Sequence, residues 1–487
     1  MSIETKSVNS PTLFRNNLLV FFLIFLLHAT FKIIFLTNSG FWYGETFNLF
    51  YAEQDWGLIK HTSEWNRSAP LYYYFLWIWR NLFGIGEFAI RFSSIFFSAL
   101  AAGLLYIIVS KHFNKVAAFI ALLLFSSSNE IYSYSQEVSC QSVVLFLVMA
   151  SFYFFFNLLE KKSISSIILL GICNFLLIYT QYITIIIPVF QMLSVLLFYN
   201  SQILKSTGIS FFITLLLTFW RITLKTINCI FYPIKNNQIP QPTFDDIKNM
   251  FYGFFNGEIL FWIFTGITLV TLGYLIYSKK LKLKEETEKI KFTCILFCGV
   301  GGMFTCDALC FLMPEVSNGY FLFTSLFLYI LIGLLLSKLG NEIKYALVGL
   351  AIFFGLCSFS RMNFNVNKSM DYKNAVMVVK KLRTPETLIL VETRDMGHLF
   401  AYYFDKNIFT DFKGMESKLN AKGIYLVSTA EDVKAIDLSK YKRIILTQTF
   451  ETLNPKDKEL IDYVFSKYKF NASSKRYADI TLSLFGK

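Results

Sequence analysis

The sequence has little charge for its length, because only 16% of its 487 residues are Asp, Glu, Lys or Arg. A soluble globular chain carries about 25%, so this chain has too few polar groups to cover an ordinary soluble surface. Disorder and a solenoid with a polar face are excluded for the same reason. The chain has instead 55% hydrophobic and 18% aromatic residues, with a mean hydropathy of +0.49. These values indicate a membrane protein, and the length permits on the order of ten spans.

Sequence signals for a metal site or a nucleotide site are also missing. No pair among the eight cysteines has the close spacing of a zinc knuckle. Cys294/Cys298 and Cys306/Cys310 are four residues apart and could share a helix face, but small residues of membrane helices explain them as well. No glycine-rich loop follows a strand-like run, so nucleotide binding is not indicated.

Long apolar runs alternate with short polar connections from residue 18 to residue 359. The first run lacks a small-residue cleavage site and is too long for a signal peptide, so we expect an uncleaved span. The runs together predict a polytopic α-helical membrane protein with about eleven transmembrane helices. The expected spans are Leu18–Leu36, Phe88–Ser110, Val116–Tyr132, Val143–Leu159, Ile164–Tyr179, Ile183–Tyr199, Gly208–Ile222, Ile259–Tyr277, Phe292–Met313, Tyr320–Leu336 and Tyr345–Phe359.

Lysine occurs in every second connection between these runs. The connections that would be cytoplasmic if the N-terminus is cytoplasmic are Lys111–Lys115, Glu160–Ser163, Ser201–Ser206, Lys279–Lys291 and Lys338–Lys344. Because basic residues collect on the cytoplasmic side, the pattern predicts a cytoplasmic N-terminus in the inner (plasma) membrane. An odd number of spans then places the C-terminal region outside the cytoplasm. The net charge of +13 thus indicates orientation and not a nucleic-acid partner.

Charge rises and apolar runs shorten in residues 361–487. We expect a small soluble extracytoplasmic α/β domain here, after a transmembrane domain of residues 1–360. Expected helices are 371–382, 398–404 and 458–468, and expected strands are 387–391, 423–427, 443–447 and 480–485. The simplest role for such a domain is packing or docking.

The first outer loop, residues 38–87, is unusually long and rich in Trp and Tyr. Long connections are often functional, and these residue types favour the membrane–water interface. Residues 70–83 predict a helix lying in that interface, with Pro70 at its first turn. The loop is therefore expected to be held against the membrane surface.

Two acidic and two basic residues are notable on the predicted outer face. Glu45 follows the first span and is either a functional acid or simply a solvated acid of the loop. Glu137 lies near the bilayer, where an ionisable group is costly and usually functional. Arg91 can snorkel or bind an anionic head group, and Arg67 can meet phosphate at the interface. A hydroxyl acceptor needs a base, and a phosphate leaving group needs positive charge or a metal. These residues would suit a lipid-linked substrate that contains phosphate.

The conspicuous ionisable residues inside the expected spans are His28, Lys32 and Asp307. Lys32 is near the outer end of its span and is expected to snorkel. His28 is expected to be a packed polar residue, and Asp307 either packs or faces a cavity.

Several segments together resemble a known family. They are residues 41–49 (FWYGETFNL), 68–76 (SAPLYYYFL), 82–94 (LFGIGEFAIRFSS), 134–137 (YSQE) and 179–182 (YTQY). Their order and spacing over about residues 10–200 resemble the bacterial dolichyl-phosphate-mannose-protein mannosyltransferase-like glycosyltransferases, which have the GT-C fold and are related to the aminoarabinose transferases.

The resemblance implies an integral-membrane glycosyltransferase. Its donor would be a polyprenyl-phosphate-linked sugar, and a hydroxyl on lipid, glycan or protein would attack with inversion on the outer face. Glu45 and Glu137 match family acids and would be catalytic; they are also the ligands for a divalent metal, if one is used, and no other cofactor is expected. Arg67, Arg91, Tyr72 and Tyr73 would bind the donor phosphate or lipid, and Gln136, Gln181, Tyr182 and Tyr320 would line the substrate cavity.

The chain departs from the family pattern at several positions. Gly44 stands where the family has an Asp, Gly319 where many members have an Arg, and Ala69 where they have a Pro. One explanation is that Glu45 has taken over the role of base. Two alternatives therefore stay open: a non-catalytic relative that acts as a scaffold or partner in envelope glycan assembly, and a glycolipid transporter. The transporter is disfavoured because the spans show no internal two-fold repeat and few charges.

Overall fold

The computed structural model describes residues 11–34, 36–57, 59, 69–198, 200–231, 243–279, 283, 285–312, 318–339, 371–449, 455–477 and 480–486, with single residues and pairs between 345 and 356. The described residues group into two units. The first takes its residues from 1–34, 63–72 and 91–364, and the second from 35–62, 73–90 and 365–487. The expected domain division at residue 360 stays a prediction.

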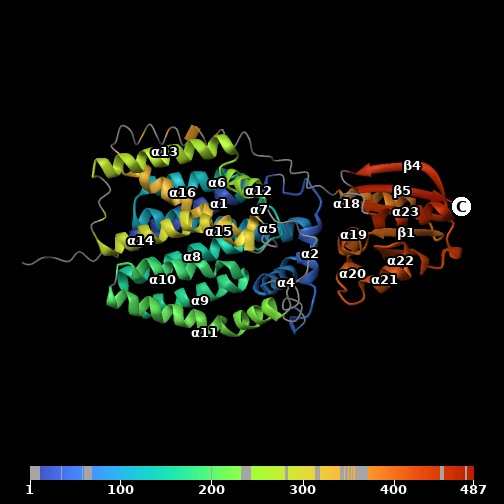
Figure 1. Ribbon diagram of the computed structural model, residues 1–487, viewed down its shortest axis with the longest axis horizontal. Coiled ribbons are helices and arrows are strands. Elements are labelled where there is room, and N and C mark those ends of the chain that lie inside the picture. Colours follow the sequence, from blue (N-terminus) through green and yellow to red (C-terminus); the bar gives the residue numbers. More distant parts are fainter. Residues whose placement is uncertain are drawn as a thin grey trace, which may run out of the picture. The chain divides into compact units, whose positions relative to one another are not determined.

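The first unit is a bundle of apolar helices that run side by side (Figure 1). Its elements are α1 (Pro11–Ile33), α5 (Glu87–His112), α6 (Lys115–Ser127), α7 (Asn129–Ser135), α8 (Gln141–Lys161), α9 (Ile164–Thr180), η1 (Tyr182–Ile185), α10 (Ile186–Leu196), α11 (Ser201–Phe231), α12 (Phe244–Phe254), α13 (Glu258–Tyr277), α14 (Glu286–Leu296), η2 (Phe297–Gly301), α15 (Gly302–Leu312), η3 (Asn318–Phe321) and α16 (Leu322–Ser337). Ten of the expected spans therefore coincide with helices. The eleventh, Tyr345–Phe359, lies largely outside the described residues.

Not every helix of the bundle is long enough to cross a membrane unaided. Among the described residues, five helices have the necessary length and apolar composition, or six if the bent pair α6 and α7 forms one span. The others, such as the apolar part of α1 and α9, are shorter. The membrane class is confirmed, while the number of spans stays a prediction.

A break between α6 and α7 bends the chain by 63°. Backbone groups freed at such a break need partners, because hydrocarbon supplies none. The side chain of Asn256, in the turn after α12, supplies a donor and an acceptor. Its amide nitrogen donates to the Ser127 backbone carbonyl at 2.7 Å, and its amide oxygen accepts from the Asn129 backbone amide at 2.6 Å. Ser128 then caps α7 by accepting from the Ile131 amide at 3.4 Å. The break is therefore built into the fold by side chains.

The lysine-bearing connections gather at one end of the bundle. Glu160 on α8 accepts from Lys291 of α14 at 2.6 Å and pairs with His112 of α5 at 2.7 Å. At the same end Lys111 donates to Asn157 at 2.7 Å, which joins the ends of α5 and α8. This agrees with the predicted alternation of the loops, and the orientation stays a prediction.

The expectation that Lys32 snorkels is wrong. The residue is fully buried (0% exposed), and its ammonium donates to the Ser126 carbonyl at 3.3 Å and lies 4.8 Å from the centre of the Tyr132 ring. His28 lies one turn earlier and contacts the hydroxyls of Ser126 and Ser98, at 3.2 and 3.0 Å. It is a packed polar residue, as expected. Both side chains tie α1 to its neighbours, and a residue held in this way does not reach the interface.

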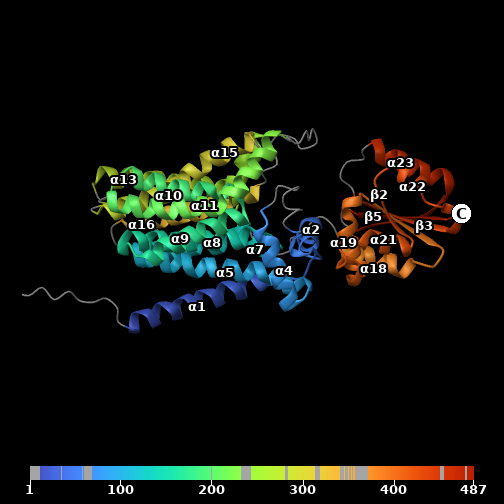
Figure 2. The same cartoon turned by 90° about the horizontal axis from the view of Figure 1, so that it is seen from below.

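The second unit contains an α/β domain with helices on both faces of a five-stranded sheet (Figure 2). Its elements are α18 (Tyr372–Leu382), β1 (Thr387–Glu392), η4 (Arg394–Met396), α19 (Gly397–Phe404), α20 (Lys406–Phe409), α21 (Met415–Ala421), β2 (Ile424–Val427), α22 (Ala430–Lys434), η5 (Leu438–Lys440), β3 (Arg443–Thr449), α23 (Pro455–Lys467), β4 (Lys469–Tyr477) and β5 (Ile480–Gly486). The strand order is β2-β1-β3-β5-β4, with β2, β1 and β3 parallel and the last two strands antiparallel. All the expected elements are present. The polar strand β4 was not predicted, because its sequence has no apolar alternation.

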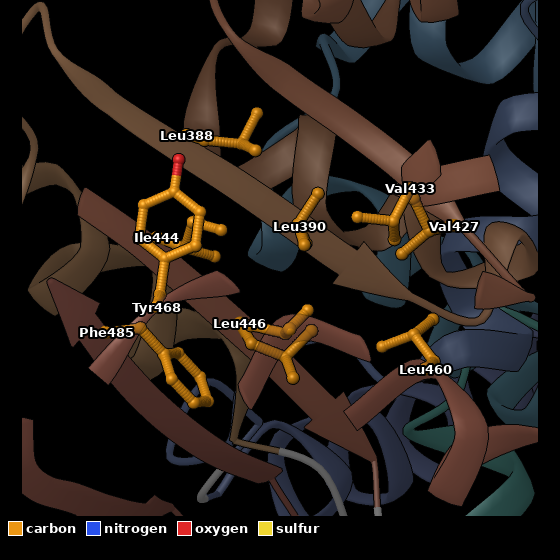
Figure 3. Packing of buried hydrophobic residues seen from close by; sticks show 10 residues of the cluster. Leu388, Leu390, Val427, Val433, Ile444, Leu446, Leu460, Tyr468 and Phe485 are labelled. Carbon is orange, nitrogen blue, oxygen red and sulfur yellow. The ribbon is translucent and has the colours of Figure 1, made fainter. Parts of the chain in front are cut away.

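One face of this sheet packs on α22 and α23 through a compact apolar cluster (Figure 3). Leu390 of β1 and Leu446 of β3 lie at its centre, opposite Val433 of α22 and Leu460 of α23, and all four are fully buried. The alternating residues of each strand supply this layer because successive side chains point to opposite faces.

The second unit also includes most of the first outer loop. It contains α2 (Tyr43–Tyr51) and most of α4 (Leu71–Phe83). Pro70 stands just before α4, so the expected helix at 70–83 is confirmed. Its position in the membrane interface stays a prediction.

We predict that Leu390→Ala destabilises the C-terminal sheet by about 2–5 kcal/mol, because it opens a cavity in a buried cluster. The measurement is hydrogen exchange of β1 and β3 amides in the full chain. Met377→Ala, on an exposed position of α18, serves as the control and should stay within about 0.5 kcal/mol. Equal effects of the two substitutions would contradict the described core.

Candidate functional site

The segment between α7 and α8 gathers the polar residues that the sequence indicated in the bundle. Gln136 ends α7, and its amide nitrogen donates to the carbonyls of Lys32 and Ile34 at 2.8 and 2.9 Å. The Tyr132 hydroxyl also donates to the Ile34 carbonyl, at 3.0 Å. These carbonyls belong to the last turn of α1, where no intrahelical donor exists. Gln136 is thus a structural link, and its expected place in a substrate cavity stays a prediction.

Glu137 follows directly and is partly exposed. The Ser94 hydroxyl of α5 donates to its backbone carbonyl at 2.5 Å, and the Ser133 hydroxyl lies 3.4 Å from its carboxylate. Arg91 lies three residues before Ser94, on the same face of α5, and is only 1% exposed. The backbone of Glu137 is therefore held by α5, on which the buried Arg91 lies one turn before Ser94.

A second contact group lies at the start of α16. Gln181, which ends α9, is buried and donates to the Tyr320 backbone carbonyl at 2.8 Å, while its own carbonyl oxygen has no hydrogen-bond partner within the described part of the chain. Tyr320 is 37% exposed, and Tyr182 is partly exposed in η1. The structure thus brings Gln181 and Tyr320 together, and their place in a substrate cavity stays a prediction.

Gly319 explains one departure from the family pattern. A Cβ atom placed there would lie 2.5 Å from the Tyr134 hydroxyl oxygen, well inside normal contact. Tyr134 of α7 therefore fills the space in which a side chain at residue 319 would begin. The same contact joins the segment before α16 to the helix that leads to Glu137.

Glu45 lies in the second unit, on α2. Its carboxylate accepts from the Trp42 amide at 3.2 Å and so caps the helix that carries it. The residue is 1% exposed, so the plain alternative of a solvated loop acid is not what the structure shows. Nearby, a Cβ atom at Gly44 would lie 2.7 Å from the Trp42 indole ring. An aromatic ring thus occupies the space beside this glycine too.

The remaining expected donor-binding residues are less informative. Tyr72 and Tyr73 are both buried, with 4% and 7% of their surface exposed, and Arg67 lies outside the described residues. Among the residues that the structure describes, no three His, Cys, Asp or Glu side chains gather into a group that could hold a metal ion.

Two features of the second unit were missed by the sequence reasoning. Glu53, two residues after the end of α2, forms an ion pair at 2.5 Å with Arg80 of α4, and burial raises the pKa of Glu53 to about 7 against the opposing effect of Arg80. His398 of α19 lies 3.4 Å from the Tyr43 carbonyl and 5.0 Å from the centre of the Tyr43 ring. The only sequence signal for His398 was its place in a helix with apolar neighbours.

The His398 contact should depend on pH. Burial lowers the pKa of His398 to about 4, although its bond to the Tyr43 carbonyl favours the protonated ring. A pKa below the ordinary 6.5 means that the full stability is present above pH 6.5 and is lost as the pH falls towards 4. The gap between these values corresponds to about 3 kcal/mol.

We predict that wild type loses up to this amount of stability relative to His398→Gln between pH 6.5 and 4, since glutamine keeps an N–H donor and does not titrate. The measurement is thermal unfolding of the solubilised full chain at each pH. A difference between the two proteins that stays constant with pH would contradict the prediction.

Comparison with known proteins agrees with this architecture. Residues 67–222 match the model of the dolichyl-phosphate-mannose-protein mannosyltransferase family. That stretch contains α4, Arg91, the Glu137 segment and Gln181. The chain matches no curated protein sequence.

The fold of nearly the whole chain is shared with ArnT from Cupriavidus metallidurans. The structure of ArnT bound to undecaprenyl phosphate aligns with a TM-score of 0.58 at 11% identity, covering 96% of this chain and 97% of ArnT. The apo structure gives 0.59 with the same identity and coverage. The Archaeoglobus fulgidus oligosaccharyltransferase aligns with a TM-score of only 0.49 at 12% identity, over 87% of this chain and 69% of that protein, which is too low to support an inference.

The family match lies on the segment that carries most of the expected motifs, and the shared fold extends from the first helix to the C-terminal sheet. The chain is thus a membrane protein with the fold of ArnT, and its residues 67–222 are similar to the dolichyl-phosphate-mannose-protein mannosyltransferase family.

Proposed function

We propose that this chain is a glycosyltransferase that takes its sugar from a polyprenyl-phosphate-linked donor and transfers it, with inversion, to a hydroxyl of a lipid, glycan or protein on the outer face of the plasma membrane. The observation that carries the proposal is the Glu137 segment. Its partly exposed acid is bound through its backbone carbonyl by Ser94 of α5, and the buried Arg91 lies one turn before Ser94 on that helix. The structural similarity to ArnT, which has been solved with undecaprenyl phosphate, supports a polyprenyl-phosphate donor.

The chemistry needs few groups. The acceptor hydroxyl attacks the anomeric carbon and its proton passes to a carboxylate, while the bond from that carbon to the phosphate oxygen breaks and the electrons stay on the phosphate. A guanidinium would stabilise the departing phosphate charge. We assign to Glu137 the role of proton acceptor, and to Arg91 that of holding the carboxylate segment or meeting the phosphate.

Glu45 is proposed as the second catalytic carboxylate. It is buried and already accepts a hydrogen bond from Trp42, so its position is fixed before substrate arrives. A preorganised acid of this kind loses little on binding. A divalent metal, if one takes part, would have to use these same carboxylates.

A second candidate function is a non-catalytic relative in envelope glycan assembly. The observation that favours it is that Trp42 and Tyr134 occupy the space beside Gly44 and Gly319, the two positions where the resemblance predicts charged residues. An analysis of the glycans in a strain that lacks this chain distinguishes the transferase from the non-catalytic relative. A missing sugar together with an accumulating lipid-linked sugar supports the transferase, and an unchanged profile supports the relative.

We predict that Glu45→Gln and Glu137→Gln each lower sugar transfer by about 100- to 10,000-fold, the range typical of a lost general base. The assay uses membranes of the deletion strain, in which the unused donor accumulates, and reads the product by mass spectrometry. Glu258→Gln, on the exposed N-terminal turn of α13, is the matched control and should keep the wild-type rate. Wild-type rates for both site variants would reject the catalytic assignment.

We also predict that a reporter fused after Lys487 lies outside the cytoplasm. The lysine-bearing connections lie at one end of the bundle, and basic connections stay on the cytoplasmic side of the membrane. Paired fusions of an enzyme active only in the periplasm and one active only in the cytoplasm make the measurement. Activity of the cytoplasmic reporter would overturn the orientation.

A further inference from the structure

The helix that carries Glu45 is attached to the C-terminal α/β domain at its first turn. The N-cap of α2 is Trp42, and the peptide groups on either side of it are both bound by α19. The Phe41 amide donates to the Tyr403 hydroxyl, and His398 Nε2 donates to the Tyr43 carbonyl at 3.4 Å. All these residues belong to the second unit.

The Tyr403 hydroxyl is itself fixed. It donates to one carboxylate oxygen of Glu87 at 2.8 Å, and Lys373 of α18 binds the other oxygen at 3.0 Å. Because its proton is directed to Glu87, the hydroxyl oxygen faces the Phe41 amide as an acceptor. The start of α2 is therefore connected through Tyr403 to the residue that begins α5.

Aromatic packing holds the rest of the helix. His398 stacks on Phe50 with 5.8 Å between ring centres and contacts Phe47 at 6.1 Å, while Phe50 also packs on Phe409 and Phe412. Tyr43, Phe47 and Phe50 are spaced at intervals of four and three, so they share one face of α2. That face is covered by α19 and the residues that follow it.

Glu45 depends on the same turn. Its carboxylate is held by the amide of Trp42 at 3.2 Å, and its own amide bonds back to the Trp42 carbonyl at 3.2 Å. A shift of Trp42 therefore moves the carboxylate. In a reacting site, a displacement of about 1 Å can cost on the order of a hundredfold in rate.

We propose that α19 of the C-terminal domain sets the position of Glu45, with His398 and Tyr403 as positioning residues for the transfer reaction. The inference rests on the proposed catalytic role of Glu45. It assigns the C-terminal domain a part in catalysis that does not require the domain to contact the substrate.

The test compares two neighbouring tyrosines in the full chain, reconstituted in nanodiscs. Tyr403→Phe removes the acceptor of the Phe41 amide. Tyr402→Phe removes the same chemical group from the next residue, whose hydroxyl donates to the Ile85 carbonyl at 2.8 Å and not to α2. Hydrogen exchange of the Phe41, Glu45 and Thr46 amides is measured in both, with the β1 and β3 amides as a check that the domain is folded.

We expect exchange of these three amides to rise by about three- to tenfold in Tyr403→Phe, the range for one lost neutral hydrogen bond, and to stay unchanged in Tyr402→Phe. His398→Leu should act like Tyr403→Phe, and His398→Gln should recover most of the protection because it retains an N–H donor.

Single-turnover transfer supplies the second readout, with the lipid extract of the deletion strain as donor source. The rate at saturating extract should fall by about 10- to 100-fold in Tyr403→Phe and His398→Leu, while the half-saturating amount and the affinity for undecaprenyl phosphate stay at wild-type values. His398→Gln should regain most of the rate.

The outcomes separate the two proposals. If the exchange of the three amides in Tyr403→Phe matches that in Tyr402→Phe, the positioning role is wrong whatever Glu45 does. If exchange rises but the transfer rate does not fall, α19 stabilises α2 without positioning its acid, which also rejects the inference. A wild-type rate in Glu45→Gln, measured alongside, rejects the catalytic role of Glu45 itself and with it the inference.

Discussion

A chain inside a bilayer must satisfy its backbone polar groups with its own atoms, and the architecture at the candidate site depends on this constraint. Each interruption of a helix in the described bundle releases carbonyls and amides that water cannot reach. At the bend between α6 and α7, the Asn256 side chain accepts a hydrogen bond from a freed amide and donates one to a freed carbonyl. At the end of α1, Gln136 donates to two freed carbonyls. Irregular backbone is therefore tolerated where a polar side chain from another element is supplied.

The same places are where chemistry becomes available. The irregular segment after Gln136 exposes Glu137, and the break that ends α9 places Gln181 against the segment before α16. In a regular helix that crosses hydrocarbon such groups would be buried or absent, because an ionisable side chain there is costly. The polar contacts that repair the broken helices thus also hold the residues proposed to act on substrate.

Aromatic residues serve different purposes in the two units. In the second unit, rings on α2 pack against α19 and its neighbours and fix a helix that carries a buried acid. At Gly44 and Gly319, where the resemblance predicts charged side chains, a Cβ atom would lie within 2.7 Å of the Trp42 ring and the Tyr134 hydroxyl, respectively. The two positions that lack the expected charge are thus positions beside which an aromatic side chain lies. The abundance of Phe, Tyr and Trp in this chain reflects helix packing as much as an interface belt.

The sequence by itself determined the membrane class, the helix positions and the α/β pattern of the C-terminal region, because these follow from hydrophobic runs and their period. It also indicated Glu45, Glu137 and Gln181 through local motifs. It could not place Lys32, since snorkelling or burial depends on the neighbours of α1. Nor could it relate His398 to Tyr43 or Tyr134 to Gly319, which are far apart in the chain. Only tertiary structure decides such pairs, because they depend on how helices pack and not on the local pattern of either partner.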